Sequence, residues 1–290
     1  MYDVLNKIYQ HCVFRHNHNK TRYGLLRSCL HGERTLIVAD RGYESYNVFA
    51  HLLNTPNVDF LIRVKQNNSA THEIKKLPMM EVDTDVSFII SNTQTKFDKE
   101  NNHILLQLQK NKDKTYSTKT NEGRWEFPSP YPMKFRVVRI LLDTGEYETL
   151  ATSLPRSITP SEIKELYHAR WGIETAFREL KYGLGLVNLH GKKDEFVKQE
   201  IFATMTMSNF CSRIANTIVM KQKKDNMYEY KVNMKMAIYL CKKFYRTKDA
   251  NAKQLMKDIA KYTEPIRQGR SDERNIKVKL FVGFIYRVSA

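Results

Sequence analysis

Four polar side chains between residues 167 and 181 have the types and the spacing to bind phosphate and a metal ion. They stand at offsets 0, 3, 7 and 14 in the segment YHARWGIETAFRELK and are Tyr167, Arg170, Glu174 and Lys181. On a helix that turns about 100° per residue, they fall within an arc of roughly 60° over about four turns. One carboxylate, two cations and a phenol therefore line one stripe, which can hold a metal ion beside a phosphate chain.

A second stripe on the same predicted helix is apolar and lies roughly 90° around the axis. Its members are Leu166, Ala169, Ile173, Phe177 and Leu180. We therefore expect the helix to pack on a core and to hold Glu174 rigidly at the edge of that core. The nearby cation of Arg170 favours the ionised form of a shielded Glu174. The alternative is a solvated surface helix whose charged residues only form ordinary ion pairs.

Another candidate site residue, Asp40, follows a short apolar run at residues 35–39, TLIVA. This continuous, partly β-branched run predicts a strand that is buried on both faces. Gly42 allows a turn after Asp40, and Ser45 is placed to cap a helix over residues 46–53. Ligands of open α/β sheets gather beyond the carboxyl ends of the strands, so Asp40 is well placed for chemistry. The alternative is an ordinary aspartate in a strand-to-helix turn.

The two segments together resemble one protein family. The residues at 167, 170, 174 and 181 match the Y-(2)-R-(3)-E-(6)-K motif of bacterial insertion-sequence DDE transposases in every identity and every spacing. The segment DRGY at residues 40–43 resembles the stretch that holds the second catalytic Asp of this family. The resemblance implies an α/β fold with a ribonuclease H-like core and an enzyme that cuts and joins DNA.

The resemblance also implies a metal centre. We assign Asp40 and Glu174 as catalytic ligands of Mg²⁺, with Mn²⁺ as a substitute, because hard cations prefer carboxylate oxygens. Two such ions about 3.5–4 Å apart serve the attacking and the leaving oxygen of a phosphodiester.

The remaining residues of the motif are predicted to bind DNA. Arg170 and Lys181 are predicted phosphate clamps, and Tyr167 is a predicted hydroxyl donor to the DNA backbone or to a catalytic water. Trp171 lies next to the stripe and is assigned to stacking on an unpaired base. Its alternative role, which the residue type favours, is packing within the protein.

One ligand that the resemblance implies is not visible in the chain. The first catalytic Asp of the family lies on the first strand of the sheet, upstream of the segment that resembles residues 1–10, MYDVLNKIYQ. Asp3 lies in the wrong strand to replace it. We therefore expect the chain to be N-terminally incomplete and unable to cleave transposon-end DNA alone. Nicking that requires Mg²⁺ or Mn²⁺ and disappears in Glu174→Ala would contradict this expectation.

The predicted elements alternate as in an α/β protein. We expect a hairpin over residues 1–16, a short helix over 21–30, and a strand–helix–strand run that ends at residue 65 with parallel strands. Alternating apolar stretches then predict further strands, with a hairpin turn at residues 143–146. The predicted domains are the first part of a ribonuclease H-like core without its first strand (1–65), a β-rich insertion (66–153), the second part of the core with the catalytic-Glu helix (154–220), and a basic, mostly helical C-terminal region (221–290).

The catalytic-Glu helix is predicted to begin at a capping box, with Thr159 as N-cap, Pro160 at the first position and Glu162 at the third. We expect Gly183 to end it. The helices predicted after it span residues 195–220, 230–246 and 252–262.

Composition indicates an anionic partner. The 290-residue chain has a net charge of +17, and residues 221–290 hold 18 Lys or Arg against 7 Asp or Glu, so +11 of the excess lies there. We predict double-stranded DNA, the transposon ends, as the partner; RNA binding and solubility are the alternatives. The resemblance adds a homodimer on DNA as an option. Four scattered cysteines indicate a reducing cytoplasm, bacterial by the resemblance, and no apolar run approaches the roughly 18 residues of a membrane span.

Three functions stay open at this point. The first is a DDE transposase that cuts and joins DNA through Mg²⁺. The second is a catalytically dead chain that occupies DNA or pairs with intact transposase and inhibits transposition. The third is a nuclease with a ribonuclease H-like core, which hydrolyses DNA without strand transfer. The genomic sequence upstream of the Met1 codon separates the first two, because an Asp-Gly strand there indicates an element remnant and a promoter indicates a regulator.

Overall fold

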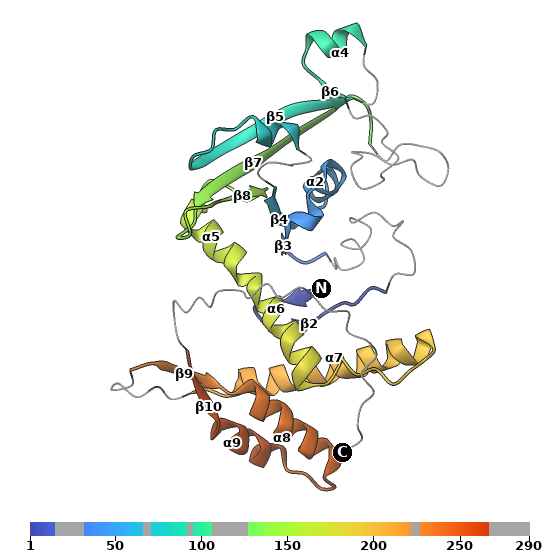
Figure 1. Ribbon diagram of the computed structural model, residues 1–290, viewed down its shortest axis with the longest axis vertical. Helices are drawn as coiled ribbons and strands as arrows, with labels where there is room; N and C mark the ends of the chain where they lie inside the picture. Colours follow the sequence, from blue (N-terminus) through green and yellow to red (C-terminus); the bar gives the residue numbers. More distant parts are fainter. Residues whose placement is uncertain are drawn as a thin grey trace. The chain divides into compact units, whose positions relative to one another are not determined.

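The computed structural model describes residues 1–14, 32–65, 71–91, 95–105, 127–220, 222 and 227–266. The chain divides into two compact units (Figure 1). We call Val13–Arg170 the sheet unit, and Met1–Cys12 together with Trp171–Ala290 the helical unit. The predicted helix at residues 21–30 lies outside the described residues.

The sheet unit is built around a mixed six-stranded sheet (Figure 1). Its order is β3 (Thr35–Ala39), β4 (Val58–Val64), β8 (Tyr147–Thr152), β7 (Tyr131–Leu141), β5 (Val82–Ser91) and β6 (Ile104–Leu105). β3 is parallel to β4 and β5 to β6, whereas the other neighbours are antiparallel. Short helices also belong to this unit: η1 (Arg41–Tyr43), α3 (His72–Lys75) and α4 (Lys96–Glu100). The strands predicted between residues 66 and 153 thus extend the same sheet that contains β3 and β4.

The segment from β3 to β4 positions Asp40. α2 (Tyr46–Leu53) connects the two parallel strands, whose register pairs Ala39 with Ile62. Parallel neighbours need such a crossover, so the predicted strand–helix–strand run is confirmed, including its helix bounds. Ser45 occupies the N-cap position of α2, but its side chain makes no capping hydrogen bond.

Successive residues of a strand point to opposite sides of the sheet, so β4 presents apolar side chains on both faces. A helix packs against each face. On one face Phe60 of β4 packs on Phe49 of α2, with ring centroids 5.5 Å apart. On the other face Leu61 packs in a cluster with Tyr167 of α5 (Pro160–Ala169). Full burial of each such side chain contributes about 2 kcal/mol, so the two clusters fix α2 and α5 to the sheet.

α5 begins at the predicted capping box. Thr159 Oγ1 accepts from Glu162 N at 3.3 Å, and Glu162 Oε2 accepts from Thr159 N at 2.7 Å. Arg136 of β7, which is 4% exposed, holds the loop before α5 by donating to two of its carbonyl oxygens at 2.7 and 2.9 Å. Asp83 of β5 binds the same guanidinium through hydrogen bonds of 2.7 and 2.8 Å. The sheet and the start of α5 are therefore tied together by one buried cation.

Helices dominate the second unit. Its helices are α6 (Trp171–Arg178), the π-helical turn η3 (Glu179–Gly183), α7 (Asp194–Thr217), α8 (Met234–Arg246) and α9 (Ala252–Ala260). Its strands are β1 (Tyr2–Asp3) paired with β2 (Ile8–Tyr9), and β9 (Glu229–Val232) paired with β10 (Thr263–Ile266). Hydrogen bonds of 2.7 Å between the Asn209 amide and the backbone of Tyr9 fasten the predicted N-terminal hairpin to α7.

The predicted helix from Thr159 to Gly183 begins and ends at the predicted residues, but it is not one continuous α-helix. α5 ends at Ala169, and the amide of Arg170 bonds to the carbonyl of Tyr167 only three residues earlier. After α6 the chain widens into η3, where Leu184 N bonds to Glu179 O five residues earlier. The left-handed backbone that follows lies at Gly185 (φ +85°) and not at Gly183.

The predicted apolar stripe is only partly correct. Leu180 is buried, but Ala169 and Phe177 are exposed. Ala176 is the residue of α6 that is buried. In the C-terminal region, residues 229–232 form β9, so the helix predicted at 230–246 is shorter and begins at Met234. No helix in the described part of the chain is long and apolar enough to cross a bilayer.

Candidate active site

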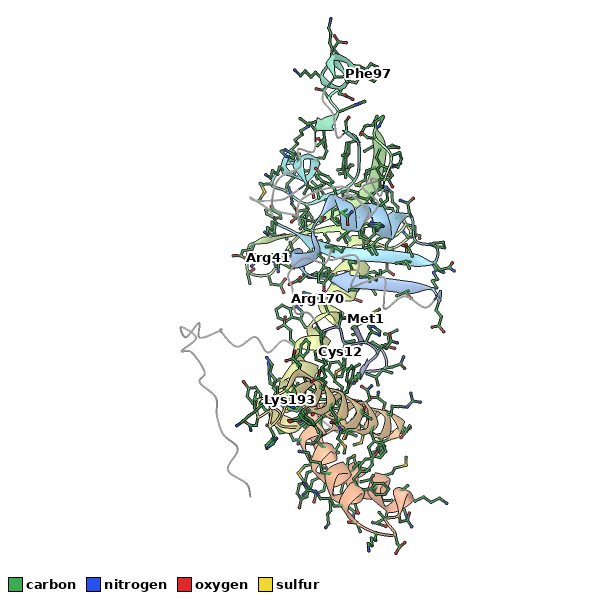
Figure 2. All side chains as sticks on the ribbon, turned by 90° about the vertical axis from the view of Figure 1, so that its right-hand side faces the viewer. Met1, Cys12, Arg41, Phe97, Arg170 and Lys193 are labelled. Carbon is green, nitrogen blue, oxygen red and sulfur yellow. The ribbon has the colours of Figure 1, made fainter. Side chains whose placement is uncertain are left out.

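Asp40 lies directly beyond the carboxyl end of β3, as predicted, and its side chain is exposed. It caps the short helix η1, because its Oδ1 accepts a hydrogen bond from Gly42 N at 2.9 Å. Figure 2 shows this turn of the sheet unit with the side chain of Arg41. Since the amide occupies Oδ1, the second oxygen of Asp40 is the one suited to a ligand.

Gly42 keeps the carboxylate in this position. A Cβ at residue 42 would lie 2.9 Å from Asp40 Oδ1, which is closer than real contacts allow. Any other residue there would push the Asp40 side chain away from the backbone amide. The glycine thus allows the Asp40 carboxylate to approach the backbone amide of residue 42.

Glu44 supports the same turn and was missed by sequence reasoning. It is 4% exposed; its Oε2 accepts from Lys65 N at 2.9 Å and its Oε1 from Thr71 Oγ1 at 3.3 Å. The turn after Asp40 is thereby joined to the end of β4 and to the segment before α3. These partners lie 21 and 27 residues away in the chain, so no local pattern could reveal them.

Tyr167 and Arg170 are motif residues of the sheet unit that lie in contact with each other. The Arg170 guanidinium carbon lies 5.4 Å from the centroid of the Tyr167 ring, within cation–π range. Tyr167 is only 1% exposed and packs with Leu61 and Ile163. Burial raises the pKa of its hydroxyl, and Arg170 partly opposes that rise. Tyr167 therefore stays a neutral phenol that supports the Arg170 side chain.

Glu174 lies in the first turn of α6 and is half-buried. A carboxylate in the first turn is favoured by the helix dipole. Trp171, the first residue of α6, is 42% exposed. Gly172 lies against the hairpin, where a Cβ would be 3.5 Å from Val4.

Lys181 is exposed in the π-helical turn η3. Such turns advance the chain less per residue than an α-helix does, and they occur often at functional sites. The helical-wheel phase predicted for Lys181 is therefore wrong, because the residues from Glu179 onward are not α-helical.

Asp3 serves the hairpin turn. Its Oδ1 accepts from Leu5 N and Asn6 N at 3.0 and 2.9 Å, and its Oδ2 accepts from the side chains of Asn6 and Gln10 at 2.7 and 3.3 Å. Both oxygens thus have structural partners. Within the described ranges, no three Asp, Glu, His or Cys side chains gather as a metal site.

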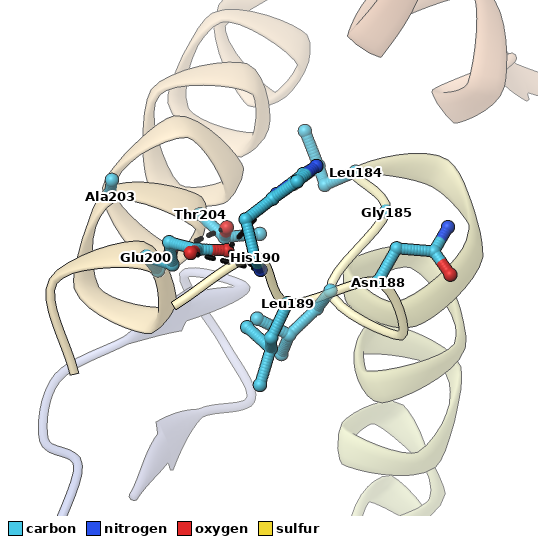
Figure 3. A pocket seen from close by; sticks show the side chains of 9 residues that line it. Leu184, Gly185, Asn188, Leu189, His190, Glu200, Ala203 and Thr204 are labelled. Carbon is cyan, nitrogen blue, oxygen red and sulfur yellow. Dashed lines mark hydrogen bonds and ion pairs between the residues drawn. The ribbon is translucent and has the colours of Figure 1, made fainter. Parts of the chain in front are cut away.

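A hollow of about 400 Å³ lies beside the loop that follows η3 (Figure 3). Glu200 of α7 borders it and accepts from the amides of His190 and Gly191 at 2.9 and 2.6 Å. The amide of His190 is the main cause that lowers the pKa of Glu200. Glu200 is the only acid among the described residues that line this hollow, and it is engaged in fastening the loop to α7. The hollow is therefore a structural feature of the helical unit and no metal centre.

The predicted site residues are divided between the units. Asp40, Tyr167 and Arg170 belong to the sheet unit, and Trp171, Glu174 and Lys181 to the helical unit. The boundary falls inside the motif, between residues 170 and 171.

The fold is mixed α/β, with an exposed aspartate at a strand end and a Tyr-Arg-Glu-Lys segment that begins on α5. A family model described as the transposase DDE domain matches residues 1–210, so the chain belongs to the DDE transposase family. The match includes both Asp40 and Glu174 and ends within α7. A search of curated proteins finds no match.

Proposed function

We propose that the chain carries the catalytic domain of an insertion-sequence transposase, and that Asp40 and Glu174 jointly bind the divalent ions that DNA cleavage and strand transfer require. The observation that carries the proposal is Asp40: an exposed carboxylate at a strand end, with one oxygen fixed by Gly42. Family membership over residues 1–210 supports the reaction class.

The residues fit a hard cation such as Mg²⁺ or Mn²⁺. Asp40 offers a carboxylate oxygen that the Gly42 amide does not use, and Glu174 offers a half-buried carboxylate on a helix. When bound, such an ion relieves negative charge on the phosphate. The chain's own cations add to this: Arg170, steadied by the Tyr167 ring, and Lys181 bind phosphate oxygens next to the scissile bond. Trp171 contributes a ring on which an unpaired base stacks.

The alternative is a DNA-binding or dimerising inhibitor of transposition without catalytic activity. The observation that favours it is the basic region 221–290, which carries +11 of the net charge of +17 and lies outside the residues matched to the DDE domain. In this alternative the chain binds DNA or an intact transposase as a homologous partner.

Mn²⁺ titration of the full chain tests the proposal without requiring catalysis. Asp40→Asn and Glu174→Gln should each weaken Mn²⁺ binding by tenfold or more, because a lost carboxylate ligand removes both charge and a donor. Glu165→Gln is the matched control, since Glu165 is an exposed acid on α5 outside the site, and it should bind Mn²⁺ as the unaltered chain does. Unchanged Mn²⁺ binding in both site variants would exclude the proposed metal centre.

A further inference from the structure

We infer that α8 presents a second contact surface for the phosphate backbone of double-stranded DNA, separate from the candidate active site. The inference rests on the proposed function for its choice of DNA as the polyanion. One face of the helix carries the residues concerned, which we call the α8 stripe: Lys235, Tyr239, Lys243 and Arg246. All four are exposed, Tyr239 by 60%.

The stripe is continuous along the helix. At about 100° and 1.5 Å per residue, its members fall within an arc of roughly 80° and extend over roughly 16 Å. α8 contains no acidic residue. A rigid row of cations without interspersed acids matches the row of charges on a duplex, where each phosphate contact releases counterions.

The packing of α8 fixes the direction of the stripe. Ala237, Ile238 and Cys241 are buried in the core of the helical unit, together with Cys211 of α7 and Ile259 of α9. These buried positions lie on the opposite side of the helical wheel from the stripe. The apolar face is therefore already covered by protein. An amphipathic helix that binds a lipid surface would need that face for the bilayer, so a membrane is disfavoured.

Helix stability does not explain the stripe. Lys243 and Arg246 lie in the last turn, where cations favour the helix dipole, but Lys235 lies in the first turn, where a cation is unfavourable. The first turn contains no acid to offset it. Among the described residues, the helix dipole does not favour the Lys235 cation, so its charge is available to an external polyanion.

Neighbouring lysines have partners within the unit. Lys231 pairs with Glu264 at 3.1 Å, and Lys261 with Asp258 at 2.7 Å. Lys242, beside the stripe, donates to the carbonyl of Gly183 at 3.4 Å and joins α8 to η3. Within the described ranges the stripe cations form no such ion pair; Lys243 acts on Asp258 only as a more distant charge.

The α8 stripe lies outside the residues that match the family model. The match ends at residue 210, and α8 begins at Met234. Tyr239 adds a phenol that donates to a phosphate or packs on a sugar, as polar side chains do in backbone contacts. Such contacts position a duplex without reading its sequence, so the stripe should bind unrelated sequences equally well.

The test compares the salt dependence of duplex binding in two triple variants of the full chain. Lys235→Gln/Lys243→Gln/Arg246→Gln removes the stripe, and Lys76→Gln/Lys96→Gln/Lys99→Gln removes three exposed lysines of the sheet unit. Both lower the net charge from +17 to +14. Each lost phosphate contact reduces the slope of log K against log salt by about 0.9. The stripe variant should therefore lose about 2–3 from this slope for a random-sequence duplex, and the control less than about 1.

Equal losses in the two variants would overturn the inference, because net charge alone would then explain binding. Retained duplex binding with lost binding to single-stranded RNA or to anionic vesicles would overturn it as well. Lys235→Gln alone removes an unfavourable first-turn cation, so it should keep the fold and still reduce the slope by about 1. Mn²⁺ binding should be the same in all these variants, which separates a failure of the stripe from a failure of the active-site proposal.

Discussion

A single backbone amide sets the position of the Asp40 carboxylate. The bond from Gly42 N to Oδ1 orients the side chain at the end of β3, and the absence of a Cβ at residue 42 makes room for it. Glu44 holds the remainder of the turn from its buried position. The chemistry of the site thus depends on residues that need not touch the substrate.

Gly42→Ala tests this orientation. The new methyl group would lie 2.9 Å from Asp40 Oδ1 and displace the carboxylate. We expect Mn²⁺ affinity to fall about tenfold, as for loss of a supporting contact at a metal ligand, with stability within about 1 kcal/mol of the unaltered chain. Arg41→Lys, which keeps the charge in the same turn, is the control. Full Mn²⁺ affinity in Gly42→Ala would show that the amide bond does not position Asp40.

At the scale of elements, a buried ion pair determines where α5 begins. Arg136 is 4% exposed and joins β7 to the loop before α5, and Asp83 of β5 neutralises it. The hydrogen bond from Arg136 is the main cause that lowers the pKa of Asp83. The Arg136–Asp83 pair thus holds the loop before α5 on the sheet.

Asp83→Asn should destabilise the fold by about 2 kcal/mol near neutral pH, because it leaves the buried Arg136 without its counter-charge; the 28% exposure of Asp83 keeps the value moderate. The folded-state pKa of Asp83 is depressed, so its contribution is present above the ordinary Asp pKa of about 4 and is lost as pH falls through the folded value. Urea unfolding at pH 7 and at about pH 3 should show the difference shrinking on acidification.

Asp85→Asn is the matched control on the same strand. Asp85 is 40% exposed, and its ion-pair partners among the described residues are the exposed Lys134 and Arg156, so its loss should change stability by less than about 1 kcal/mol. Equal effects of the two substitutions at pH 7 would refute the role of the buried pair.

The chain leaves the helical segment α6–η3 through the left-handed backbone of Gly185. Its φ of +85° is strained for any residue with a Cβ, so Gly185→Ala should destabilise the fold by about 1 kcal/mol. Gly183→Ala should have a smaller effect, since the added methyl meets only the flexible end of Ile238 at 3.1 Å. Urea unfolding of both variants measures this order; the reverse order would favour Gly183 as the terminating residue.

At the scale of the whole molecule, the sequence predicts features that depend on neighbouring residues, but it does not predict contacts between distant residues. The strand before Asp40, the helix at 46–53 and the capping box of α5 follow from short-range patterns, and the structure confirms them. Other features depend on contacts between residues far apart in the sequence, which a single sequence does not reveal. They are the burial of Tyr167, the Arg136–Asp83 pair and the contacts of Glu44. The π-helical turn depends on packing around Leu180 and Leu184, so helical periodicity alone could not predict it.

The two proposed metal ligands are far apart in the sequence: Asp40 belongs to the sheet unit and Glu174 to the helical unit, and they are 134 residues apart. The proposed function requires that their carboxylates serve the same ions. Family membership places both residues in one matched domain, which supports the proposal.

Cadmium binding by paired cysteines tests that requirement most directly. Thiolates bind soft Cd²⁺ and give a ligand-to-metal absorption band whose strength grows with the number of thiolates bound to the ion. Asp40→Cys/Glu174→Cys should bind one Cd²⁺ per chain more tightly than either single variant or the unaltered chain, with a stronger band per bound ion than either single variant gives. A double variant that binds Cd²⁺ no better than the single variants would contradict the account.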